Sequence, residues 1–258
     1  MSLFVNIFAV MDEKNFKDFD LVEFPIEGVA AYWISLKKVF SSQKDKLKFL
    51  KGEIEYTSEP YIKYLLELLS SSFDPYKIEK LAKYKQDTIL NQLQKKFVII
   101  SIGILGIASK ENSQQVLVRI LSKFPFFSVT ESKIIKKTDQ LLKRYSSEAN
   151  LVIDVDHRLP IEELVPNLLF HCVLARREGP DVCFELLSKI RSFFFKEGLK
   201  LVIDGFDADF IKHRLNLQQK EIIYATKKNM DLSLEMCLAI KEEIPYEELL
   251  KIANAFML

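Results

Sequence analysis

The sequence predicts a mainly α-helical protein, either a multi-helix bundle or a helical-repeat-like array, with few or no strands. Three observations support this prediction. Apolar residues recur at the spacing of one helix face along most of the chain. Helix-start signals separate these stretches. The chain has 258 residues and is 48% hydrophobic, which is enough for one large domain or two small ones, each with its own core.

Helix signals are densest between residues 58 and 145, where we expect four or five helices with short connections. Ser58 is a candidate N-cap, with Pro60 in the first turn of its helix. Asp74 and Pro75 repeat this arrangement. Ser128 and Glu131 have capping-box spacing at the start of a later helix.

The longest apolar stretch is Phe97–Ala108, which is 12 residues long. A helix that crosses a membrane needs about 20 apolar residues, so we expect this segment to be buried in the protein core. No transmembrane insertion is predicted. The first residues lack the basic region of a signal peptide.

Residues 20–28 are predicted to form either a short strand or an extended segment, and a helix around Trp33 is predicted after them. A β-rich stretch at 148–160 interrupts the helices. We therefore expect an N-terminal helical domain at 1–148 and a C-terminal helical domain at 149–258. In the second domain we expect helices at 160–179, 180–198, from about 207, across 217–243 and after Pro245.

An acidic turn, Asp204-Gly205-Phe206-Asp207, lies between two of these helices. Asp204, Asp207 and Asp209 resemble the start of a calcium loop, but the glycine comes too early and Leu215 stands where a glutamate is required. We therefore expect a turn. Gly205 would supply the positive φ and Asp207 would cap the next helix.

The composition excludes several classes of function. The chain has 37 basic and 36 acidic residues, and this balance argues against nucleic acid as the main partner. The three cysteines and three histidines lack metal-site spacing, and no phosphate-binding or nucleophile motif occurs. We predict no catalytic residue, no metal and no cofactor. The acidic pair Asp154 and Asp156, beside His157 and Arg158, is read as a loop before Pro160.

Two blocks in the second half, "ARREG" at 175–179 and "GLKLVIDGFD" at 198–207, occur in a recognisable order and spacing. With them, residues 162–215 resemble the cytoplasmic segment of the flagellar stator MotA family. The resemblance implies two antiparallel helices joined at Gly179-Pro180 and a turn at Asp204–Asp207. It covers about a fifth of the chain.

The resemblance also implies partner-binding residues. In the family, a basic residue at the "RREG" turn and an acidic residue in the following helix face the rotor. Arg176 matches the basic position and Arg177 lies beside it. The acidic position falls at Phe184, and Glu185 is one place later. The family has four membrane spans and none is predicted here, so we do not expect a complete stator subunit.

The sequence thus favours a non-enzymatic, helical protein-interaction module or scaffold. We expect it in the cytoplasm or at the periphery of the inner membrane. Flagellar rotor or stator components are the expected partners, and a homo-oligomer is compatible with this reading. The alternative is an enzyme or nucleotide-binding protein of unfamiliar helical fold. A deep polar pocket would favour that alternative, whereas a shallow charged or apolar helix face would favour the interaction module.

Overall fold

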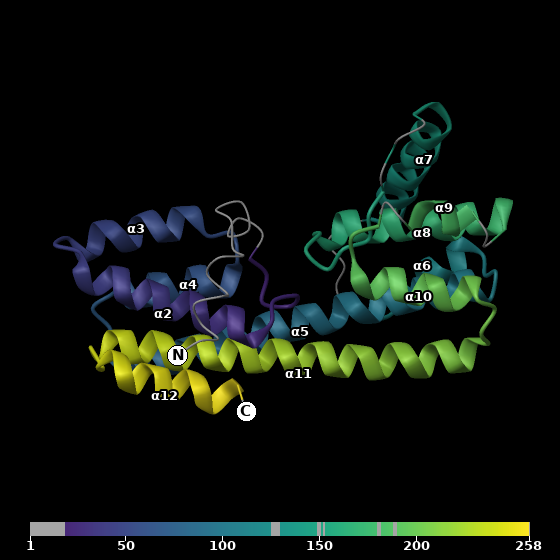
Figure 1. Ribbon diagram of the computed structural model, residues 1–258. Helices are drawn as coiled ribbons and strands as arrows, with labels where there is room; N and C mark the ends of the chain where they lie inside the picture. The colour runs from purple at the N-terminus through teal and green to yellow at the C-terminus, as the bar shows by residue number, and fades with distance from the viewer. Residues whose placement is uncertain are drawn as a thin grey trace. The chain divides into compact units, whose positions relative to one another are not determined.

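The computed structural model describes residues 19–124, 130–148, 151, 153–179, 182–187 and 190–257. All regular elements in this part of the chain are helices and none is a strand (Figure 1), which confirms the mainly α prediction. The helices are α2 (Ile26–Ser42), α3 (Lys46–Tyr56), α4 (Pro60–Ser70), α5 (Pro75–Ala108), α6 (Ser113–Leu121), α7 (Glu131–Ser147), α8 (Ile161–Glu178), α9 (Val182–Leu187), α10 (Phe193–Ile203), α11 (Ala208–Lys241) and α12 (Tyr246–Met257).

Contacts divide the chain into two compact units. Unit 1 combines Met1–Asn91 with Ile222–Leu258, and unit 2 is Gln92–Glu221. This division differs from the expected domains 1–148 and 149–258. The reason is α11, which is continuous from Ala208 to Lys241 and whose second half packs in unit 1. The sequence instead predicted two helices over this stretch.

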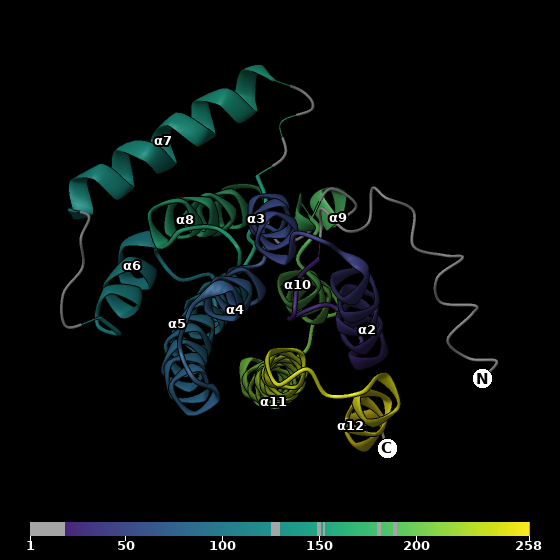
Figure 2. The same ribbon diagram turned by 90° about the vertical axis from the view of Figure 1, so that its left-hand side faces the viewer.

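Unit 1 is built around the aromatic side chains of Trp33 and Tyr61, which are fully buried. Helix α2 packs against α3 and α12, and α3 packs against α4 (Figure 2). The amide of Asn229, on α11, donates hydrogen bonds to the carbonyls of Leu21 and Phe24, both at 2.9 Å. The segment before α2 is therefore fixed to α11 by side-chain hydrogen bonds, and residues 21–24 form turns and a bend instead of a strand.

Unit 2 has α8 at its centre, with α6, α7 and α9 packed against it (Figure 1). The predicted burial of Phe97–Ala108 is confirmed: Phe97 is 1% exposed and Ile104 is completely buried. No described helix is both long enough and apolar enough to cross a membrane. Cys172 lies on α8 and its thiol donates to the carbonyl of Gly103 at 3.6 Å, so α5 and α8 approach closely at this point.

The helix starts show which sequence signals determine the local structure. The Asp74 cap is confirmed, because its carboxylate accepts from the backbone N–H of Lys77 at 2.9 Å. The Ser58 cap is wrong, since Glu59 is the N-cap of α4 and accepts from Ile62 N–H at 2.7 Å. Helix α7 begins at Glu131 after Thr130, and Ser128 lies outside the described residues.

The helix expected across 180–198 is instead two helices, α9 and α10, and Gly198 lies inside the second. Side chains replace helical hydrogen bonds at the break. The N–H of Arg191 donates to the Asp154 carboxylate at 3.2 Å, and the Ser192 hydroxyl accepts from the N–H of Phe195 at 3.3 Å. These interactions satisfy the backbone groups that a continuous helix would have paired.

Candidate functional site

The acidic turn at 204–207 is the joint between α10 and α11. Gly205 has a φ of 77°, as expected for a residue that supplies the left-handed conformation. Its N–H bonds to the carbonyl of Val202 and the N–H of Phe206 bonds to that of Leu201, both at 3.1 Å. Asp207 caps α11 by accepting from Phe210 N–H at 2.9 Å. The predicted turn and cap are confirmed.

Two phenylalanines are exposed at this joint. The rings of Phe206 and Phe210 stack with centroids 4.7 Å apart and planes tilted by 19°. Phe206 is 45% exposed and Phe210 is 39% exposed. Phe184 and Phe193 are also exposed and also lie between residues 162 and 215. A stacked aromatic pair at the surface is unlike a single scattered apolar residue, which needs no explanation.

The sequence-predicted partner-binding residues lie around the end of α8. Arg176 and Arg177 are both exposed in its last turn. Gly179 ends the helix with a φ of 96° and a ψ of 162°, a conformation almost restricted to glycine. Glu185 lies within α9, and its side chain is outside the described residues. The two arginines are thus neighbours at one exposed helix end, where they also complement the helix dipole.

The Asp154–Arg158 segment is a loop, as predicted, and its polar side chains hold neighbouring elements. The buried carboxylate of Asp156 accepts from the Arg158 guanidinium at 2.7 Å. Burial raises the pKa of Asp156, but the hydrogen bonds from Arg158 outweigh it and the net shift is downward. Lys96, on α5, donates to the carbonyl of His157 at 2.6 Å. These contacts give the acidic loop a structural role.

His171 is the most deeply buried titratable side chain in this region. Its Nε2 lies 2.8 Å from the carbonyl oxygen of Ile153, so this nitrogen carries the proton of the neutral ring. Phe170 and Phe195 contact the ring edge-on, each with centroids 5.1 Å away. Burial lowers its pKa to about 4. His171 therefore acts as a neutral core residue that anchors the loop, and its neighbour Cys172 is buried with it.

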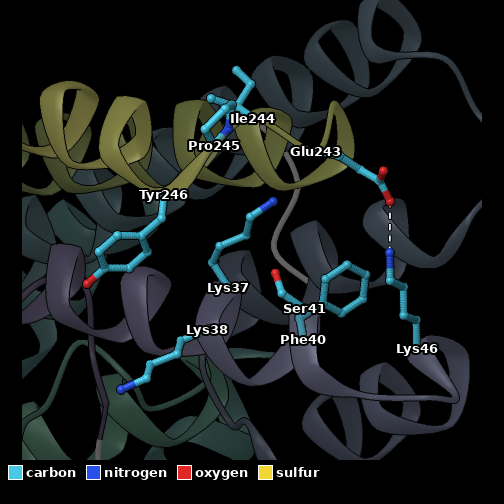
Figure 3. Close-up of a pocket in the computed structure, with 9 residues that line it drawn as sticks. All are labelled: Lys37, Lys38, Phe40, Ser41, Lys46, Glu243, Ile244, Pro245 and Tyr246. Atoms are coloured by element: carbon cyan, nitrogen blue, oxygen red, sulfur yellow. Dashed lines mark hydrogen bonds and ion pairs between the residues drawn. The ribbon is translucent and has the colours of Figure 1, made fainter.

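Unit 1 contains a cavity of about 690 Å³ between the end of α2 and the start of α12 (Figure 3). Three lysines contribute to its walls, and so does one carboxylate, that of Glu243, which pairs with Lys46 at 2.8 Å. The described residues that line it are Lys37, Lys38, Phe40, Ser41, Lys46, Glu243, Ile244, Pro245 and Tyr246. Sequence reasoning missed this site, because its two halves are some 200 residues apart along the chain.

A second hollow in unit 1, of about 560 Å³, lies between α2 and α3. Aromatic and aliphatic side chains form most of its wall, including Tyr32, Val39 and Phe49, and Glu53 is the one carboxylate among its described residues. No group of three or more described His, Cys, Asp or Glu side chains could hold a metal ion.

Comparison with known protein families, with curated proteins and with solved structures found no match for the chain. Its function is therefore argued from its own residues.

Proposed function

We propose that the chain is a non-enzymatic protein-interaction module that binds its partner through the exposed surface of residues 162–215. The single observation that carries the proposal is the exposed, stacked pair Phe206 and Phe210 at the α10–α11 joint. Aromatic residues are enriched in the buried centres of protein interfaces, where a few of them supply most of the binding energy.

The arginines at the end of α8 support the same proposal. Arg176 and Arg177 are exposed, and arginine is the charged residue most often found among interface hot spots. Exposed charges at an interface rim act mainly on the rate of association and on its salt dependence. The partner surface is therefore expected to carry acidic residues opposite this turn.

The finer part of the proposal is that the partner belongs to a flagellar motor, as a rotor or stator component. It rests on the "ARREG" and "GLKLVIDGFD" blocks of the MotA-like segment. The confirmed turn at 204–207 is compatible with the helix–turn–helix order that the resemblance implies. In this proposal the chain works in the cytoplasm or at the periphery of the inner membrane.

The test is a pull-down from a lysate of a motile bacterium with the tagged full chain, with mass-spectrometric identification of what co-purifies. Two variants are compared with the wild type: Phe206→Ser with Phe210→Ser, and Arg176→Glu with Arg177→Glu. Phe73→Ser is the control, since Phe73 is 44% exposed but lies in unit 1. Circular dichroism checks that all variants remain helical.

We expect a motor protein to co-purify with the wild type and the control. The aromatic double variant is expected to weaken this binding about ten-fold or more, and the arginine variant to weaken it most at low salt. Equal recovery of the partner by all four proteins would rule out this surface. Recovery of partners with no place in the motor would rule out the finer proposal and leave the interaction module.

A further inference from the structure

Lys37 is an unusual residue for its place in the fold. The helix period puts it on the buried side of α2 with Trp33 and Phe40, where an apolar side chain would complete the core. The residue as a whole is only 8% exposed, although its ammonium group keeps some contact with solvent, and no described residue accepts a hydrogen bond from this group. A lysine whose stem is covered by core residues and whose charged end opens into a hollow is well placed to bind an anion there.

The ammonium group of Lys37 is directed into the cavity between α2 and α12. In Figure 3 its side chain extends from α2 towards Pro245, and the hydroxyl of Ser41 faces the same space. Lys38, the next residue, also lines the cavity, but it is exposed. The α2 wall of the cavity therefore carries two lysines, of which Lys37 is the less exposed, and the hydroxyl of Ser41.

The remaining walls make the cavity suitable for an anion. Burial lowers the pKa of Lys37 and so does Lys46, whereas Glu243 raises it, and a bound anion would favour the charged ammonium in the same way as Glu243. Among the described residues of the lining, the only carboxylate is that of Glu243, which is already paired with Lys46 at 2.8 Å. Helix α12 begins at Tyr246, so the positive end of its dipole lies at the cavity, although Glu247 and Glu248 in the same first turn offset part of its field.

We propose that this cavity binds the phosphate group of a small phosphate-bearing ligand, with Lys37 as the charged partner and Ser41 as a hydrogen-bond donor. Lysine is a common phosphate binder because its ammonium group is a compact charge with three donors. The volume of about 690 Å³ exceeds what a phosphate ion fills and lies within the usual range for small-molecule sites. Tyr246, 46% exposed, offers an aromatic face to the rest of the ligand.

The site is independent of the surface proposed for protein binding, because all of its residues belong to unit 1. The phosphate group could belong to a soluble metabolite or to a lipid headgroup, and the two sources share the same recognition chemistry. Binding is therefore measured separately with soluble probes, inorganic phosphate and glycerol 3-phosphate, and with phosphatidylcholine vesicles that contain phosphatidic acid.

The decisive variant is Lys37→Met, which keeps the straight side-chain stem and the helix propensity but removes the charge. Removal of this charge is expected to leave the chain folded, because no described residue accepts a hydrogen bond from it, and a melting curve checks this. Lys63→Met is the matched control, with the same loss of charge at an exposed position on α4 of the same unit, outside the cavity lining. Ser41→Ala provides a second, milder change in the same cavity.

Isothermal titration calorimetry with the soluble probes and co-sedimentation with the vesicles should detect binding to the wild type and to Lys63→Met. Lys37→Met is expected to bind about ten-fold more weakly or worse, and Ser41→Ala to show a smaller loss. Binding confined to one arm assigns the source of the phosphate. If no probe binds the wild type, or if Lys63→Met weakens binding as much as Lys37→Met, the proposal is overturned and Lys37 merely reaches solvent through the cavity.

Discussion

Glu59 and Ile62 form the first hydrogen bond of α4: the carboxylate accepts from the backbone N–H at 2.7 Å, although Glu59 is only 7% exposed. Burial raises the pKa of Glu59 from 4.5 to about 7, although hydrogen bonds from the backbone N–H groups of Ile62 and Tyr61 oppose the rise. The cap is thus held by a carboxyl group that is protonated at mildly acidic pH.

This arrangement predicts that Glu59 makes folding less favourable as pH rises. Between about pH 4.5 and 7 the folded chain keeps a proton that the unfolded chain has lost, so its stabilising contribution is complete below pH 4.5 and is lost through pH 7. The shift corresponds to roughly 3 kcal/mol. Glu59→Gln keeps an acceptor for Ile62 and should lack this pH dependence.

The measurement is urea unfolding at pH 4.5 and 7.5. Glu55→Gln, at an exposed position on α3, is the control and should follow the wild type. If Glu59→Gln and the wild type lose the same free energy of unfolding between pH 4.5 and 7.5, the raised pKa of Glu59 is not the cause of this pH dependence.

His171 predicts the opposite dependence. Burial lowers its pKa from 6.5 to about 4, so between these values the unfolded chain binds a proton that the folded chain does not. Its contribution to stability is present above pH 6.5 and is lost as pH falls through 4, by roughly 3 kcal/mol.

His171→Gln can still donate to Ile153 but does not titrate, so its free energy of unfolding should change less between pH 7 and 4.5. His213→Gln, at an exposed site, should titrate like the wild type. Parallel curves for all three proteins would contradict the prediction.

Three helices end in the same hydrogen-bonded motif, but only one of them uses glycine in the left-handed position. Gly205 ends α10, whereas Lys110 (φ 51°) ends α5 and Glu243 (φ 57°) ends α11. A side chain in this conformation costs about 1 kcal/mol. Lys110→Gly should therefore raise the free energy of unfolding by up to about 1 kcal/mol, as measured by chemical denaturation. Lys123→Gly, in the turn after α6, serves as the comparison and should not be stabilising.

The reverse change at the α10–α11 joint should destabilise the chain. A Cβ added at Gly205 would meet no atom within 4 Å, so Gly205→Ala tests the backbone conformation alone and should cost about 1 kcal/mol. Gly52→Ala is the matched control, because Gly52 is also in open space but lies inside α3 with ordinary helical φ. It should raise stability by about 0.5–1 kcal/mol. Equal effects of the two substitutions would show that the turn tolerates a side chain.

The sequence was sufficient to predict those parts of the structure that residues close in sequence determine. Asp74 before Pro75, Gly205 and Asp207 each act within a few residues, and all three behave as predicted. The break between α9 and α10 could not be predicted in this way. It depends on Asp154, which is distant in sequence and binds the N–H of Arg191 only after the fold brings them together.

The candidate sites show the same contrast between features set by nearby residues, which the sequence indicates, and features that depend on the fold. The exposure of Arg176 and Arg177 agrees with their place at a helix end, which the glycine at 179 marks in the sequence. The cavity around Lys37 required the return of the chain through α11 to α12, which no local pattern indicates. One signal was nevertheless available: the helical period places Lys37 among apolar residues of α2, where a lysine is out of place.

The positions of Glu59 and His171 in different units have a consequence for heat denaturation. Glu59 belongs to unit 1 and His171 to unit 2, and acid favours the first while it opposes the second. If the chain melts in one transition, the two contributions largely cancel and its melting temperature changes little between pH 4.5 and 6.5. If the units melt separately, calorimetry should record two peaks that move in opposite directions with pH, the unit 1 peak downward and the unit 2 peak upward as acid is neutralised. Helices α5 and α11 each belong partly to both units. The temperature difference between the two peaks would therefore measure how far these helices couple the unfolding of one unit to that of the other.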